Sequence, residues 1–191
     1  MKSLALALAL LLAAALAAAQ STDRYRPNQP PPVKRDPSGG LPSSPRLTLG
    51  SIEKGDRAPD FDLPLAGGGK VRLSTLRGQW VVVCFCPRRG LEALDSLARE
   101  VPERVLVLGV VPEKVGVLSA WAAQRETKAL LLDDMRGDIS ALYGAYDLTR
   151  NLPRPGYAIV DPRGVVNRIE IRDGLVPGDA ARAVQYAVTG L

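Results

Sequence analysis

Apolar residues follow two different spacings along this chain, and the two spacings alternate over most of its length. A near-continuous apolar run from Trp80 to Cys86 is typical of a strand that is covered on both faces. From Leu91 the apolar positions recur three and four residues apart, which predicts a helix. Another buried strand is expected over 104–111. A strand, a helix and a strand in this order predict a right-handed βαβ unit.

The same alternation continues to the end of the chain. Further strands are expected over 71–73, 129–132, 157–160 and 165–171, and further helices after Pro112, around 139–143 and from about Pro177 to Gly190. The last two strands are separated by Pro162-Arg163-Gly164, a sequence with turn chemistry, so we expect them to pair as a hairpin. These patterns predict an α/β layered domain.

The first 50 residues differ in composition from the rest. Residues 1–19 combine Lys2 with an uninterrupted Leu/Ala run, the pattern of a secretory signal peptide. Because about 20 apolar residues are needed to span a bilayer, we expect cleavage before Gln20 and no stable membrane span afterwards. Residues 20–50 contain seven prolines and are expected to be a disordered tether. The predicted folded domain is 51–191, in an exported protein of the periplasm or the extracellular space.

Composition excludes several function classes. The formal net charge of +5 is scattered along the chain, with no cluster of Lys and Arg that would favour nucleic-acid binding. Histidine is absent, which removes Ser-His and Cys-His catalytic arrangements and His-based metal sites. Gly67-Gly68-Gly69 lacks the lysine and helix that phosphate binding needs. We therefore expect no cofactor and no metal. Asp133 and Asp134 could pair for acid–base chemistry, but they follow a strand and precede a helix, where acids usually cap the helix or face solvent, and we expect one of these structural roles.

Several blocks of sequence, taken in order, resemble the redoxin branch of the thioredoxin-like superfamily. This branch includes the alkyl hydroperoxide reductase/thiol-specific antioxidant family, the peroxiredoxins. The matching blocks together span most of 51–175: Gly55-Asp56-Arg57-Ala58-Pro59-Asp60-Phe61-Asp62-Leu63, Val71-Arg72-Leu73-Ser74-Thr75-Leu76-Arg77-Gly78, Trp80 to Pro87, Val107-Leu108-Gly109-Val110, Leu131-Leu132-Asp133-Asp134, and Tyr157-Ala158-Ile159-Val160-Asp161-Pro162-Arg163-Gly164. The resemblance implies a thioredoxin-like α/β fold, with a central mixed β-sheet flanked by helices.

The active-site motif departs from the family's pattern. Peroxiredoxins carry P-x-x-x-T-x-x-C, and counting from Pro87 places Leu91 at the threonine and Leu94 at the cysteine. The C-x-x-C of thioredoxin-like reductases is also absent from the chain. On the opposite wall of the family's site, Pro155 occupies the position of a cis-proline, with Arg154 beside it. The resemblance therefore implies an altered site and a candidate cis bond between Arg154 and Pro155.

Cys84 and Cys86 are the only cysteines in the chain, and they carry the candidate chemistry. Cys86 is expected at a strand end just before a helix N-terminus, beside Pro87 and Arg88. Such a position stabilises a thiolate and lowers its pKa. One interpretation therefore makes Cys86 a single reactive thiol, accompanied by Cys84 in the site. Substrate would bind near Pro87, Arg88, Arg154 and Pro155, and a thiol reductant would resolve the oxidised sulfur.

Other interpretations remain open. Cysteine often behaves as a small buried apolar residue, so both side chains could simply fill the core. A redoxin domain that has lost catalysis would then act as a binding or scaffolding module, with a protein partner in a groove near Pro155. A disulfide between Cys84 and Cys86 needs a strand end or a bulge, because residues two apart in a regular strand are too distant to bridge. A wholly enclosed Cys86 would favour the binding module over the enzyme.

Overall fold

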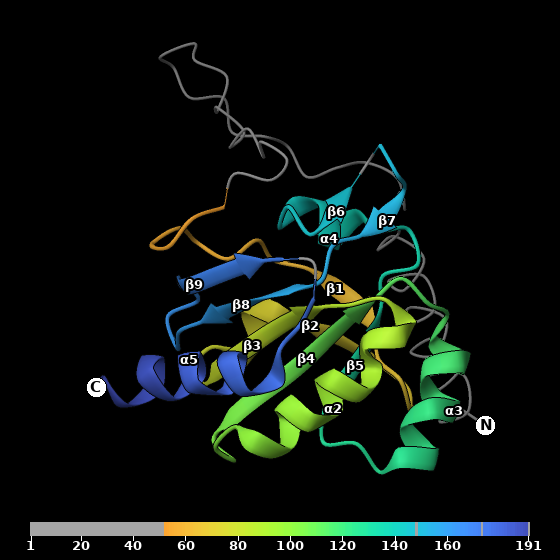
Figure 1. Ribbon diagram of the computed structural model, residues 1–191, viewed down its shortest axis with the longest axis horizontal. Helices are drawn as coiled ribbons and strands as arrows, with labels where there is room; N and C mark the ends of the chain where they lie inside the picture. Colours follow the sequence, from red (N-terminus) through yellow and green to blue (C-terminus); the bar gives the residue numbers. More distant parts are fainter. Residues whose placement is uncertain (1–51, 148, 173, 191) are drawn as a thin grey trace, which may run out of the picture. The chain divides into compact units, whose positions relative to one another are not determined.

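A five-stranded mixed sheet forms the centre of the computed structural model, which describes residues 52–147, 149–172 and 174–190. The strand order is β5-β4-β3-β8-β9 (Figure 1). The strands β3, β4 and β5 run parallel to one another, whereas β8 and β9 join the sheet antiparallel. Their bounds are β3 Trp80–Phe85, β4 Val105–Val111, β5 Leu130–Asp133, β8 Gly156–Val160 and β9 Val166–Ile171.

Helices and short hairpins cover the two faces of this sheet. The helices are α2 Leu91–Glu100, α3 Val115–Arg125, α4 Asp138–Leu142 and α5 Pro177–Thr189, with short 3₁₀ turns η1 Leu73–Leu76 and η2 Arg88–Gly90. Two hairpins lie outside the main sheet: β1 Asp62–Pro64 with β2 Lys70–Arg72, and β6 Tyr146–Asp147 with β7 Leu152–Pro153. An α/β architecture with a mixed sheet between covering elements is thereby confirmed.

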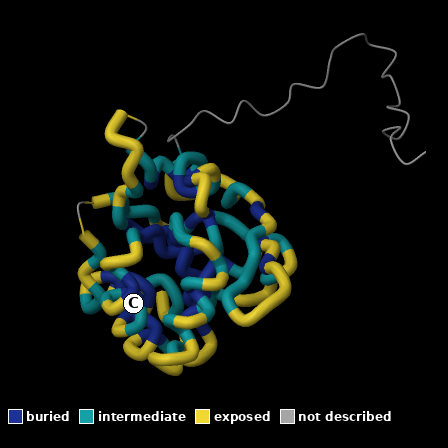
Figure 2. Tube along the Cα trace, turned by 90° about the vertical axis from the view of Figure 1, so that its right-hand side faces the viewer, coloured by how far each residue is buried: buried dark blue, intermediate teal, exposed yellow. Residues whose placement is uncertain are grey.

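The alternation of side chains along β3 divides the core into two clusters. Successive strand residues point to opposite faces. Val82 and Cys84, continued by Cys86, lie on the face covered by α2, α3 and α5. Val81, Val83 and Phe85 lie on the face covered by the β1–β2 hairpin, η1 and α4. The buried residues occupy the interior beneath exposed loops and helix surfaces (Figure 2). Both faces of β3 are therefore buried from solvent, as its continuous apolar sequence predicts.

Strand register determines which loops meet at the carboxyl end of the parallel strands. Phe85 is opposite Val110 on one side and opposite Gly156 on the other. Continuing the antiparallel pairing by one residue places Cys86 beside Pro155. The loop after β3 and the segment before β8 therefore lie next to each other, where the resemblance implied the two walls of a site.

Most predicted elements are confirmed within one or two residues. The β8–β9 hairpin is present, and Asp161 organises its turn by accepting hydrogen bonds from Arg163 N and Val165 N, each at 2.9 Å. The predicted strand at 71–73 begins at Lys70 and ends at Arg72, because Leu73 starts η1. The predicted signal peptide and tether lie outside the described residues. Over the residues that are described, the structure has no helix with the length and apolarity to cross a membrane.

Candidate functional site

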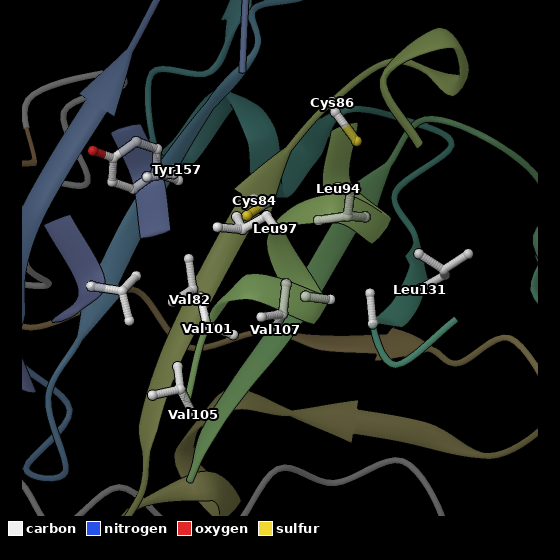
Figure 3. Close-up of a cluster of buried hydrophobic side chains, with 14 of the residues drawn as sticks. Val82, Cys84, Cys86, Leu94, Leu97, Val101, Val105, Val107, Leu131 and Tyr157 are labelled. Atoms are coloured by element: carbon white, nitrogen blue, oxygen red, sulfur yellow. The ribbon is translucent and has the colours of Figure 1, made fainter. Parts of the chain in front are cut away.

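Cys86 lies just beyond the last residue of β3, at the junction with η2 and α2. Its backbone N donates to Val110 O at 3.3 Å, which continues the pairing with β4 past the end of the strand. The side chain has no solvent-exposed area. Figure 3 shows it on the side of the sheet where Leu94 and Leu97 of α2 lie, and all three belong to one buried cluster. The sequence therefore predicts the backbone position correctly, but the sulfur is enclosed.

Gly90 closes the space above Cys86. A Cβ built on Gly90 would lie 3.0 Å from Cys86 Cβ and 3.7 Å from Cys86 Sγ. Gly90 is held there because its N donates to Pro87 O at 2.7 Å across the η2 turn. The absence of a side chain at this position lets the turn approach the cysteine closely. The thiol is consequently shielded by backbone as well as by side chains.

Burial raises the pKa of the Cys86 thiol to about 12. We expected the helix N-terminus and the nearby cations to lower this pKa, and that expectation is wrong. Arg88 and Arg89 are exposed, and Arg88 points to Glu113, with 3.8 Å between its Nη1 and Glu113 Oε2. Loss of hydration is the dominant cause of the raised pKa, because no group in the buried cluster replaces the water that would solvate a thiolate.

Cys84 lies two residues deeper in β3 and is also fully buried. It is opposite Gly109 of β4 and Tyr157 of β8. Burial raises its pKa well above the ordinary value, and the neighbouring Cys86 raises it further. Both cysteines are free thiols. The pair is therefore not a disulfide, and in the structure each sulfur packs as an apolar group.

The candidate substrate-binding residues lie at the same end of the sheet. Pro87 and Pro155 are half-buried, and Arg88 and Arg154 are exposed. The Arg154–Pro155 bond is trans, because no peptide bond in the described residues is cis, so the expected cis bond is wrong. Arg154 N donates to Ala145 O and Pro155 O accepts from Arg172 N, each at 2.8 Å. These bonds fix both residues in the segment that leads into β8.

The acidic residues near this end have structural partners. Asp133 accepts from Val115 N at 3.0 Å, which caps the start of α3, and from Met135 N at 2.9 Å. Asp134 accepts from Ser140 N at 2.9 Å and from Ser140 Oγ at 2.7 Å. Burial raises the pKa of Asp134 despite these bonds. Asp134 therefore caps the helix that follows it, α4, as expected, whereas Asp133 caps α3, the helix that precedes β5. In the described part of the chain no three His, Cys, Asp or Glu side chains are grouped to hold a metal ion.

Comparison with known proteins identifies the family. The family model described as "AhpC/TSA family" matches residues 54–169, more than half of the chain. This chain belongs to the AhpC/TSA family. It is 29% identical over 138 residues to the selenocysteine-containing peroxiredoxin PrxU of Peptoclostridium acidaminophilum, a match that covers 63% of this chain and 68% of that relative.

Solved structures show the same fold. The peroxidoxin BcpB from Mycobacterium tuberculosis superposes with a TM-score of 0.62 at 23% identity, covering 72% of this chain and 97% of BcpB. The AhpC of Enterococcus faecalis gives a TM-score of 0.63 at 20% identity, covering 73% of this chain and 97% of that AhpC. The expected thioredoxin-like fold of a peroxiredoxin-like protein is thereby confirmed.

Leu94 occupies the position at which the AhpC/TSA motif, counted from Pro87, places its cysteine. It lies in α2 with no exposed area, and Leu91, at the threonine position, is 1% exposed. A Cβ on Gly109 of β4 would overlap Leu94 Cδ2, so the leucine occupies the space above that glycine. At the two positions where the resemblance implies threonine and cysteine, this chain has leucine side chains packed in the core.

Sequence reasoning missed a groove between β9 and the C-terminal half of α5. Tyr186 of α5 is 62% exposed and lines this groove. Ala183 and Ala187 lie near it on the same helix and also line the groove. The available signal was Ala183, which lies three residues before Tyr186 and four before Ala187, spacings that place neighbouring residues on a helix surface.

Proposed function

We propose that this AhpC/TSA-family protein has lost thiol-peroxidase chemistry at its family site and acts as a binding module. One observation carries the proposal: Leu94 and both cysteines are fully buried in a single hydrophobic cluster. A thiol peroxidase needs a sulfur that meets peroxide as a thiolate. Leu94 has no sulfur, and the two thiols of the chain are buried away from solvent.

The ionisation of Cys86 supports the same conclusion. With a pKa of about 12, the thiolate fraction at pH 7 is on the order of one in 10⁵. No charged side chain compensates for the lost hydration inside the cluster, because the nearby guanidinium groups are exposed. The folded protein is therefore expected to react with peroxide far more slowly than an activated cysteine does.

A second candidate function is a single-thiol oxidoreductase that uses Cys86. Two observations favour it: Cys86 lies at the end of β3 directly before the helix, and the relatives are named as peroxiredoxins. This function requires η2 to move so that Gly90 no longer covers the sulfur. Pro87, Arg88, Arg154 and Pro155 would then border the exposed thiol, and a small thiol or a partner protein would reduce it.

A peroxide-consumption assay separates the two functions. The mature protein is incubated with hydrogen peroxide or an alkyl hydroperoxide and an excess of dithiothreitol, with Cys86→Ser and Cys84→Ser as controls. The binding module predicts the same slow consumption for all three proteins as for dithiothreitol alone. Consumption by the wild type that is lost in Cys86→Ser would establish the oxidoreductase instead.

We further propose that the protein is exported, with residues 1–19 removed and 20–50 acting as a tether. The support is the sequence pattern of a basic start, an apolar run and a small-residue end. N-terminal sequencing of protein recovered from the periplasm or the medium tests this, and the expected first residue is Gln20. A cytoplasmic protein that retains Met1 would contradict export.

A further inference from the structure

We draw no further inference here: the strongest candidate, the groove between β9 and the C-terminal half of α5 on which Tyr186 is exposed, mixes acidic and basic side chains along its lining, and nothing in the structure shows what covers it.

Discussion

Leu94 of α2 lies directly over Gly109 of β4, in space that any larger residue at 109 would need. Gly109 is in turn the parallel-strand partner of Cys84. The position to which the AhpC/TSA motif assigns a cysteine is therefore part of the helix-to-sheet packing. Any attempt to restore a sulfur at residue 94 puts it against the sheet and away from solvent.

Two substitutions of Leu94 are expected to have different consequences. Leu94→Ala should lower the free energy of unfolding by about 2–5 kcal/mol, because it leaves a cavity in a close-packed core. Leu94→Cys should cost less and should still show no peroxide consumption, because the new thiol is enclosed. Urea denaturation and the peroxide assay measure these outcomes. Rapid peroxide consumption by Leu94→Cys would show that the position is accessible in solution.

Gly90 and Gly116 form a matched pair for testing the shielding of Cys86. Gly90→Ala should lower the free energy of unfolding by about 1–3 kcal/mol, because the added methyl meets Cys86 at 3.0 Å. Gly116 lies in α3 with nothing within 4 Å of a built Cβ. Gly116→Ala should therefore raise stability by about 0.5–1 kcal/mol through helix propensity. Equal effects of the two substitutions in urea denaturation would contradict the close contact above the thiol.

Alkaline pH should destabilise the protein through its buried thiols. The pKa of Cys86 is about 12 in the folded state, whereas an unfolded cysteine has a pKa of about 8.5. A pKa raised by folding contributes stability that is complete below the unfolded pKa and is lost as pH rises toward the folded one. The free energy of unfolding should thus fall by about 1.4 kcal/mol per pH unit for this thiol above about pH 9.

The variant Cys86→Ala tests this contribution. Unfolding measured from pH 8 to pH 10.5 should show a shallower decline in Cys86→Ala than in the wild type, because the variant removes the Cys86 thiol together with its effect on the pKa of Cys84. Cys84→Ala should also flatten the decline, since burial raises the pKa of Cys84 too. Parallel curves for the wild type and both variants would show that the thiols ionise as readily in the fold as out of it.

Tyr143 contributes a partly buried hydrogen bond on the opposite face of the sheet. Its hydroxyl donates to Pro59 O at 2.9 Å, and its ring lies 5.0 Å from the ring of Phe85. Tyr143→Phe should lower the free energy of unfolding by about 1 kcal/mol, because it leaves the carbonyl of Pro59 without this donor while the ring stays packed. Thermal or urea unfolding measures the change. An unaltered midpoint would contradict a stabilising role for this bond.

Sequence patterns predict the sheet and its helices well because those elements repeat one spacing over many residues. The apolar run from Trp80 and the helical spacing from Leu91 correspond to β3 and α2. The hairpin of β6 and β7 was not predicted, because strands of two residues are too short to show a repeating spacing of apolar positions. Local spacing likewise could not show how closely Gly90 approaches Cys86.

The candidate site illustrates the same limit. The sequence places Cys86 correctly at a strand end before a helix, and the resemblance correctly places Pro155 in the adjacent segment. The predicted electrostatic environment of the thiol was wrong, because the order of residues in the sequence does not reveal which way their side chains point. Arg88 extends toward Glu113 and solvent, whereas the sulfur faces the core. Burial is a property of the packed helix and sheet together, and it decides the pKa.

The rate of alkylation of the folded mature protein as a function of pH tests the central claim most directly. Iodoacetamide labelling is followed by mass spectrometry, with Cys86→Ser and urea-unfolded protein as controls. The account predicts that both thiols stay unlabelled at neutral pH until the protein is unfolded, with no reactive group titrating below about pH 8.5. Fast labelling of Cys86 in the folded protein, with an apparent pKa below that value, would contradict it and establish a reactive thiol.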